Sequence, residues 1–237
     1  MAESNRRITL FAGHYGSGKT NIALNFAHKV KPCVLADLDI VNPYFRTKDS
    51  AAALAADGIG LVVSEYANSN VDFPAMPKET YALVADRTTR VVIDVGGDDR
   101  GALALGRYVD DIRDEGNYDM LAVINASRPL TETPEDTVEV LREIEAACRL
   151  PFTGLVNNTN LGQQTTVATV VDSFAYADAV SRLMGGVPIR FTSCRADLAD
   201  AVAARAPAGL KIFPMTIQKL YYQLDLDQEK NEQGNCN

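Results

Sequence analysis

The chain has 237 residues, of which 46% are hydrophobic and 23% are charged, the composition of an ordinary globular protein. Its formal net charge of −8 argues against a broad nucleic-acid-binding surface, because phosphate binding needs clustered Lys and Arg. No apolar run approaches the roughly 20 residues that span a bilayer, the polar N-terminus lacks the pattern of a signal peptide, and the four cysteines form no CxxC pair. We therefore expect a cytoplasmic protein without a membrane segment, an iron–sulfur site or a zinc site.

Short apolar runs alternate with helical patterns along the whole chain, which is typical of βαβ units. The expected strands are 8–12, 33–38, 61–63, 90–95, 120–125, 152–156 and, as the last one, 188–192. The expected helices are 19–30, 48–57, 78–86, 102–113, 134–148, 166–184 and 197–204. Continuous Val, Ile and Leu in the strands indicates a sheet that is buried on both faces. We predict one three-layer α/β/α domain with a mostly parallel sheet over residues 1–224, and a polar, disordered tail over 225–237.

The strongest motif is the run GHYGSGKT, which fits the phosphate-loop pattern G-x-x-x-x-G-K-[ST] between a predicted strand and a predicted helix. Its glycines allow backbone N–H groups to turn toward phosphate oxygens, and the helix N-terminus adds the positive end of its dipole. We expect Lys19 to contact the β- and γ-phosphates and to serve catalysis, and the Thr20 hydroxyl to ligate Mg²⁺. The predicted nucleotide-binding residues here are Gly13, His14, Tyr15, Gly16, Ser17, Gly18, Lys19, Thr20 and Asn21. The alternative, a chance glycine-rich turn, is disfavoured by the strand and helix around it.

Two further segments place carboxylates at predicted strand ends, where ligand sites of open α/β sheets lie. In ADLDIVNPYFR (36–46), Asp37 and Asp39 alternate along the strand, so that one can approach the metal while the other positions water against the γ-phosphate. In VVIDVGGDDRG (91–101), Asp94 closes a hydrophobic strand in the Walker B arrangement, which completes a Mg²⁺ site. An ordinary acidic strand end is the alternative for 36–46, and alone it weighs about equally.

The segment GLVNNTNLG, at 154–162, partly resembles the guanine-reading sequence N-K-x-D. Asn158 replaces the Lys, and Asn160 stands where an Asp would accept the N1 and N2 hydrogens of guanine. An amide cannot offer that pair of acceptor oxygens, so we expect Asn157 or Asn158 to contact adenine. Asparagine clusters also form ordinary turns, which is the alternative.

Together these four segments resemble the MinD/ParA-like branch of the P-loop NTPases (the SIMIBI class with a deviant Walker A motif), and most closely a group of bacterial ATP-binding proteins in it. The resemblance covers about residues 8–205 and implies ATP, Mg²⁺ and often a nucleotide-controlled homodimer. It implies that Asp39 orients the attacking water and that Asp94 supports the metal through water. Asp37 is the remaining candidate metal ligand.

One position departs from the pattern of that branch. Its members usually carry a lysine at the second residue of the loop, where it contacts the phosphates of the partner subunit, and this chain has His14. Histidine is shorter and mostly neutral near pH 7. A dimer of that kind would need another cation, such as Arg46 or Arg100, or a charged His14.

Two functions fit these residues. The first is an ATPase switch or carrier for a protein client, with Asn42–Phe45 (NPYF) reporting the γ-phosphate to it. The second is an ATP-dependent small-molecule kinase or ligase, with residues 64–77 lining its substrate pocket. A packed or bystander loop is the alternative for either segment. The apolar stretch 215–226 carries a net negative charge, so we expect it to pack on the domain and not on a membrane.

Overall fold

The computed structural model describes residues 6–38, 48–63, 86–96, 105–106 and 108–217. Its strands are β1 (Ile8–Ala12), β2 (Cys33–Asp37), β3 (Ile59–Val63), β4 (Val91–Asp94), β5 (Tyr118–Ile124), β6 (Gly154–Asn157), β7 (Ile189–Arg195) and β8 (Ile212–Met215). Its α-helices are α1 (Lys19–Val30), α2 (Lys48–Ala56), α5 (Val109–Glu115), α6 (Pro134–Cys148), α7 (Val167–Leu183) and α8 (Ala199–Ala203). Two 3₁₀ turns, η1 (Gly162–Gln164) and η2 (Ala196–Leu198), follow β6 and β7.

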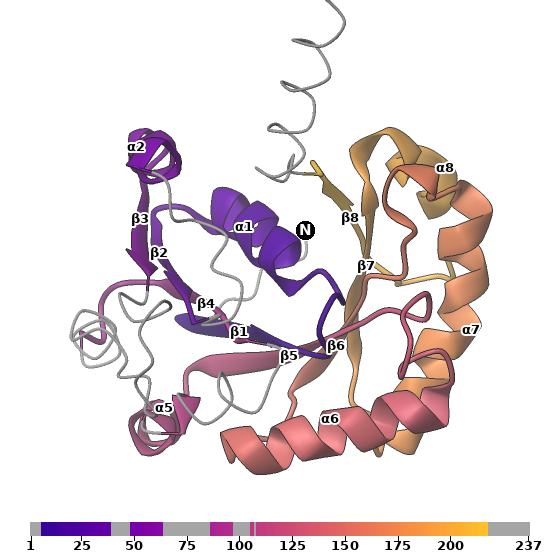
Figure 1. Cartoon of the computed structure of the whole chain (residues 1–237), viewed down its shortest axis with the longest axis horizontal. Coiled ribbons are helices and arrows are strands. Elements are labelled where there is room, and N and C mark those ends of the chain that lie inside the picture. The colour runs from indigo at the N-terminus through magenta and orange to yellow at the C-terminus, as the bar shows by residue number, and fades with distance from the viewer. Residues whose placement is uncertain (1–5, 39–47, 64–85, 97–104, 107, 218–237) are drawn as a thin grey trace, which may run out of the picture.

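The strands form one sheet in the order β3-β2-β4-β1-β5-β6-β7-β8, and every pairing is parallel. Figure 1 shows α1 and α2 on one face of the sheet and α5, α6 and α7 on the other. The predicted three-layer α/β/α fold is therefore confirmed, and the sheet is parallel throughout. Among the described helices, none combines the length and apolar character of a membrane-spanning segment.

Side chains along each strand alternate between two cores, as the period of a strand requires. In β1, Phe11 lies in the core beneath α1, while Leu10 and Ala12 lie in the core beneath α5, α6 and α7. Because neighbouring strands are paired without offset at Phe11, Asp94 and Asp37, these three side chains share the α1 face. This register brings both aspartates to the face from which the phosphate loop continues into α1.

Most predicted elements are confirmed within about two residues, and the helix at 134–148 has the predicted bounds with Thr133 as its cap. The prediction that 188–192 is the last strand is wrong, because β8 follows it. The four residues of β8 include Pro214 and are too few to show the alternating hydrophobic pattern of a strand. Contacts with neighbouring elements define this strand. Phe213 stacks on Phe191 with ring centroids 4.8 Å apart, and the Asn25 side chain holds both backbone groups of Thr216 at 2.9 and 3.0 Å. The predicted helix at 78–86 lies almost entirely outside the described residues.

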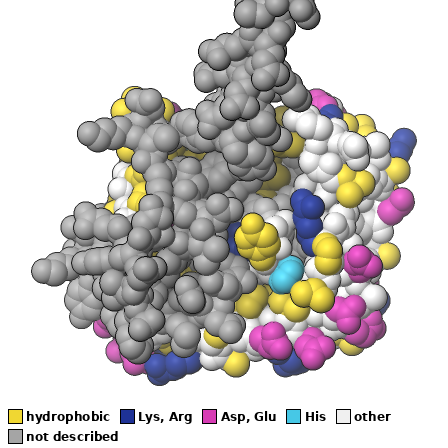
Figure 2. Space-filling model, in the orientation of Figure 1, with side chains coloured by type: hydrophobic (Ala, Val, Ile, Leu, Met, Phe, Trp, Pro, Cys, Tyr) yellow, Lys and Arg dark blue, Asp and Glu magenta, His cyan; other side chains and the backbone are white. Residues whose placement is uncertain are grey.

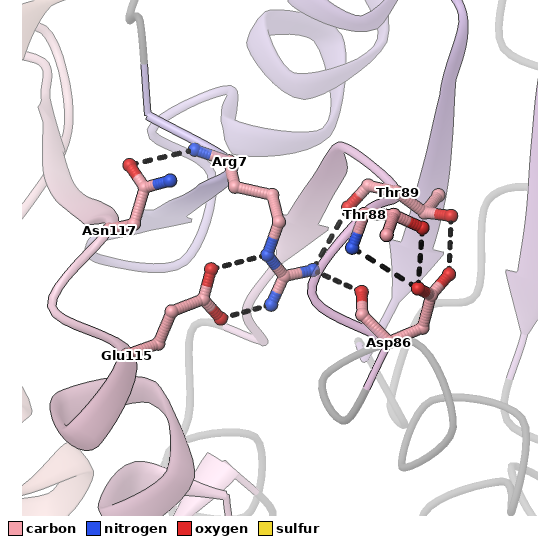
Figure 3. Close-up of polar contacts among 6 residues, drawn as sticks. All are labelled: Arg7, Asp86, Thr88, Thr89, Glu115 and Asn117. Carbon is pink, nitrogen blue, oxygen red and sulfur yellow. Dashed lines mark hydrogen bonds and ion pairs between the residues drawn. The ribbon is translucent and has the colours of Figure 1, made fainter.

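The amino edge of the sheet is held by Arg7, which is buried just before β1 (Figure 3). Its guanidinium binds both carboxylate oxygens of Glu115, at the end of α5. It also donates to the carbonyl oxygens of Asp86 and Thr89, at 3.1 and 2.9 Å, in the turn that enters β4. The backbone N–H of Arg7 donates to Asn117 Oδ1 at 3.3 Å. One buried cation thus joins the starts of β1, β4 and β5.

Candidate functional site

The carboxyl ends of all strands meet at one edge of the sheet because every pairing is parallel. At this edge, the loop from Gly13 to Gly18 connects the end of β1, a strand inside the sheet, to the start of α1. Strand β4 lies on one side of β1 and β5 on the other. Ligands of open α/β sheets bind at such an edge.

Two glycines of the loop adopt backbone angles that favour glycine and lie close to neighbouring strands. A Cβ on Gly13 (φ 153°) would lie 2.4 Å from the backbone carbonyl oxygen of Val123 in β5, which leaves no room for a side chain. A Cβ on Gly18 (φ 91°) would lie 2.3 Å from the Asn158 amide nitrogen, so the Asn158 side chain would have to move away from the loop. Glycine at these two points therefore lets the loop pack against β5 and Asn158.

Hydrogen bonds fix the loop from both sides. On the inner side, the His14 carbonyl accepts from the Ser17 N–H and from Lys19 Nζ, both at 3.1 Å. On the outer side, Asn158 Nδ2 donates to the Ser17 carbonyl at 2.6 Å, and Arg128 Nε donates to the Gly16 carbonyl at 2.9 Å. Two consecutive carbonyl groups are thus held by side chains from the ends of β6 and β5.

The N-terminus of α1 is arranged to receive an anion. Gly18 stands at its N-cap position without a side chain to accept from the first N–H groups, and the first turn contains no acidic residue. Lys19, in that turn, is buried at 5% exposure. Uncapped helix N–H groups together with the helix dipole favour a phosphate at this point. Thr20 is partly exposed in the same turn, while Asn21 accepts hydrogen bonds from Asn25 at 2.8 and 3.2 Å.

Two buried carboxylates lie side by side next to the loop. Asp37 ends β2 at 1% exposure, Asp94 ends β4 at 0%, and the two residues are direct partners in the sheet. Strand neighbours are about 4.8 Å apart, so the two carboxylates are close enough to repel each other or to share a cation. The described residues contain no group of three or more His, Cys, Asp or Glu side chains placed to bind a metal ion.

The two asparagines at the end of β6 face opposite ways. Asn158 lies on the α1 face and contacts the phosphate loop, and its Oδ1 accepts from Ser193 Oγ at 2.7 Å. Asn157 is fully buried on the α7 side, where its amide nitrogen donates to Ser173 Oγ at 2.8 Å and its Oδ1 accepts from Thr159 at 2.9 Å. A contact between Asn157 and a purine stays a prediction, and it would require these internal hydrogen bonds to open.

Counted from Asn157, the fourth position of the N-K-x-D pattern is Asn160. Counted from Asn158, the asparagine that bonds to the loop, it is Leu161. Leu161 is 47% exposed. Asn160 turns back instead: its Nδ2 donates to the Asn158 carbonyl at 2.6 Å, and its Oδ1 accepts from the Gly162 N–H at 3.2 Å. No carboxylate occupies the place of the guanine-reading Asp.

The loop also presents exposed side chains. Tyr15 is 60% exposed. Burial and the neighbouring Lys19 ammonium lower the pKa of His14 below its ordinary value, so this histidine is neutral near pH 7. Figure 2 shows large apolar side chains, a histidine and a basic side chain close together on one face of the molecule. The exposed large apolar residues among those described are Tyr15, Leu130, Leu161 and Leu183.

The described residues bring together the predicted loop, Asp37, Asp94 and Asn158. Several predicted residues lie outside the described part of the chain: Asp39, the NPYF segment (42–45), Arg46, Arg100 and residues 64–77. Sequence analysis missed Arg128 and Ser193, which hold the loop directly and through Asn158. A polar residue shortly after a predicted strand end is the signal that both share, but many residues share it.

No protein-family model matches the chain, and no curated protein matches it in sequence. Among solved structures, it is similar to the signal recognition particle receptor FtsY from Elizabethkingia anophelis, at 19% identity and a TM-score of 0.46 over 80% of this chain and 59% of that one. It is also similar to chloroplast FtsY from Physcomitrella patens, at 15% identity and a TM-score of 0.47 over 81% and 61%. The chain thus spans about three fifths of the length of these FtsY chains.

A further similar structure is HypB from Helicobacter pylori in complex with nickel, at 15% identity and a TM-score of 0.44 over 80% of this chain and 79% of that one. At these identities and scores, the likeness says nothing about nucleotide, client or assembly. The parallel sheet and the phosphate loop between β1 and α1 are those of a P-loop NTPase fold.

Proposed function

We propose that this chain is a Mg²⁺-dependent ATP-binding protein of the MinD/ParA-like class, and that it hydrolyses ATP as a switch or carrier for a protein client. One observation carries the proposal: a fixed phosphate loop, an uncapped helix N-terminus and two buried carboxylates lie at the same edge of the sheet. A phosphate and its counter-cation together require such a set of groups: amide donors at a helix N-terminus with carboxylates beside them.

The phosphates would lie within the Gly13–Gly18 loop at the N-terminus of α1. Holding the Gly16 and Ser17 carbonyls outward leaves backbone N–H groups to turn inward toward an anion. Lys19 is anchored at the mouth of this loop through the His14 carbonyl, which places its charge beside the phosphates. The loop is therefore prepared before nucleotide binds.

Mg²⁺ fits the residues next to the loop. The Thr20 hydroxyl and the Asp37 carboxylate would bind it, and Asp94 would hold its water molecules, since hard cations prefer oxygen ligands. The ion would neutralise the adjacent carboxylates and the β- and γ-phosphates together. Asp39 is proposed to orient the attacking water, so Asp39→Ala should keep ATP bound while slowing its turnover.

ATP is favoured over GTP because Leu161 stands where a base-reading carboxylate would be. An apolar side chain supplies contact with a purine ring but accepts no hydrogen bond from guanine N1 or N2. The Asn158 amide bonds to the Ser17 carbonyl and to Ser193. We propose that it lies against the nucleotide because it holds the phosphate loop. A homodimer across this site would need a cation other than the neutral His14.

Isothermal titration calorimetry with Mg²⁺-ATP tests the proposal. The wild-type chain should bind, and Lys19→Ala should weaken binding at least about tenfold, since hydrogen bonds from a charged donor contribute most. Lys29→Ala is the matched control, because this exposed lysine belongs to the same helix but lies over the Phe213 ring, 4.1 Å from its centroid. Equal affinity in wild type and Lys19→Ala contradicts the proposal. Hydrolysis measured with and without cell-extract metabolites then separates a protein client from a small-molecule substrate.

A further inference from the structure

The position of the carboxylates sets the direction of the bound nucleotide. Asp37 and Asp94 lie on the β4 side of β1, and Mg²⁺ bridges the β- and γ-phosphates in P-loop proteins. The terminal phosphate of a bound nucleotide would therefore point toward β4 and β2. The nucleoside would extend the other way, over the carboxyl ends of β5, β6 and β7. Base selection must come from residues at those three strand ends, if the proposed nucleotide binding is correct.

One carboxylate stands at the end of β7. Arg195 is the last residue of that strand and Asp197 follows two residues later. Arg195 Nε donates to Asp197 Oδ1 at 2.9 Å, and Nη2 donates to Asp197 Oδ2 at 2.6 Å. The Asp197 side chain is 61% exposed and that of Arg195 is 22% exposed. The acceptor pair thus lies at the surface and is already occupied.

A third bond holds the arginine in place. Arg195 Nη1 donates to the Gln163 carbonyl at 2.7 Å, in the turn that follows β6 and Leu161. All three nitrogens of the guanidinium are therefore engaged, and the group bridges the ends of β6 and β7. An ordinary exposed pair such as Arg182–Asp178 on α7 has a single contact at 2.7 Å within one helix. The hydrogen bonds also lower the pKa of Asp197 and raise that of Arg195, so the pair stays ionised at neutral pH.

The guanidinium and the guanine base present the same pattern of donors. Guanine offers N1–H and an N2 amino hydrogen side by side along one edge, and a carboxylate accepts both. The fork of Arg195 offers Nε–H and Nη2–H to Asp197 in the same parallel manner. Adenine has an acceptor at N1 and no amino group at C2, so it gains nothing from a free carboxylate there.

We propose that Arg195 selects against GTP by occupying Asp197 with the donor pair that guanine would otherwise supply. Neither Leu161, which follows β6, nor Asp197, whose oxygens are occupied after β7, then offers a free base-reading carboxylate. Arg195 is in this view a specificity-determining residue that acts through Asp197. It leaves the phosphate loop untouched, so it does not change how the phosphates are held.

Competition binding with Mg²⁺-ATP and Mg²⁺-GTP tests this inference on the full chain. Arg195→Met should raise GTP affinity relative to ATP by up to about fivefold, because the carboxylate is released from an exposed ion pair, which holds its partner only weakly. Arg195→Lys, which offers one donor point in place of a fork, should give a smaller gain. The double variant Arg195→Met/Asp197→Asn should return the ratio to the wild-type value, and Arg182→Met should not change it.

The outcomes separate this inference from the proposed function. An unchanged GTP-to-ATP ratio in both Arg195→Met and Arg195→Lys overturns the role of Arg195, even when Lys19-dependent ATP binding is intact. A ratio that stays raised after Asp197→Asn is added also overturns it, because the gain then does not come from the carboxylate. A wild-type chain that binds neither nucleotide overturns the proposed function itself, and this inference with it.

Discussion

Buried polar side chains occur at both edges of the sheet, but in different surroundings. At the amino edge, Arg7 is surrounded by acceptors, with both Glu115 oxygens and two backbone carbonyls around one guanidinium. At the carboxyl edge, two buried acidic residues are direct neighbours in the sheet. The hydroxyl of Ser17 and the amide nitrogen of Asn125 are buried there without a hydrogen-bond partner among the described residues. The bonds of Arg7 account for its burial at the first edge, whereas the unsatisfied Ser17 and Asn125 atoms at the second are consistent with the proposed ligand site.

Breaking the amino edge should have the largest effect on stability. Arg7→Met leaves the Glu115 carboxylate buried at 8% exposure without its cation, which should lower the free energy of unfolding by about 3–5 kcal/mol. ATP affinity of the folded variant should stay at the wild-type value, because Arg7 lies at the opposite edge. Urea unfolding and calorimetry measure the two quantities. Arg7→Met/Glu115→Leu should recover most of the loss, and a large loss of ATP affinity in either variant would contradict the separation of the two edges.

Neutralising one carboxylate at the other edge should have the reverse pattern. Asp94→Asn should weaken Mg²⁺-ATP binding about 10–100-fold, the usual effect of losing a group that orients a metal's ligands. Thermal stability without nucleotide should fall much less than in Arg7→Met, since the substitution also removes one of two adjacent like charges. Melting curves beside Mg²⁺ titrations check both parts. A variant that unfolds more easily while binding Mg²⁺-ATP normally would show that Asp94 serves the fold.

The neighbouring asparagines of β6 sharpen the comparison within one strand end. Asn158→Ala removes the bond to the Ser17 carbonyl and should weaken ATP about tenfold, equivalent to about 1–2 kcal/mol. Asn157→Ala should instead lower stability by a similar amount and leave affinity nearly unchanged, because its partners lie in the core toward α7. Measuring unfolding and ATP binding for both variants decides the matter. Equal effects on affinity would mean that both side chains serve the site.

The strand–loop–helix unit at the centre of this site was predictable because its signal is local. The apolar run of β1, the glycines of the loop and the period of α1 each specify their own backbone, so residues 8–30 fold as expected. The strand ending in Asp94 was predictable for the same reason. Its pairing with Asp37, direct and on the α1 face, follows from the register of the sheet, which no single segment encodes.

What sequence analysis missed depends on contacts between distant segments. Strand β8 exists because Phe213 packs on Phe191 and because Asn25 holds the backbone beyond it. The roles of Asn157 and Asn158 differ only because alternate side chains of β6 face different helices. The assignment of Asp39 to catalysis stays a prediction, since this residue lies outside the described ones.

The smallest expected effect concerns His14. Its lowered pKa means that the folded chain binds a proton less readily than the unfolded chain, whose histidine titrates at about 6.5. Protonation below that pH therefore favours unfolding, and the penalty disappears as the pH rises and both states become neutral. His14→Asn should remove this slope, and because the group is largely solvated the change should be below about 0.5 kcal/mol. Urea unfolding at pH 5.5 and 7.5 measures it, with His28, the second of the two histidines, unchanged in both chains. A wild-type stability that rises toward low pH relative to the variant would mean that His14 is charged beside Lys19, and it would then become a candidate for the missing cation of the loop.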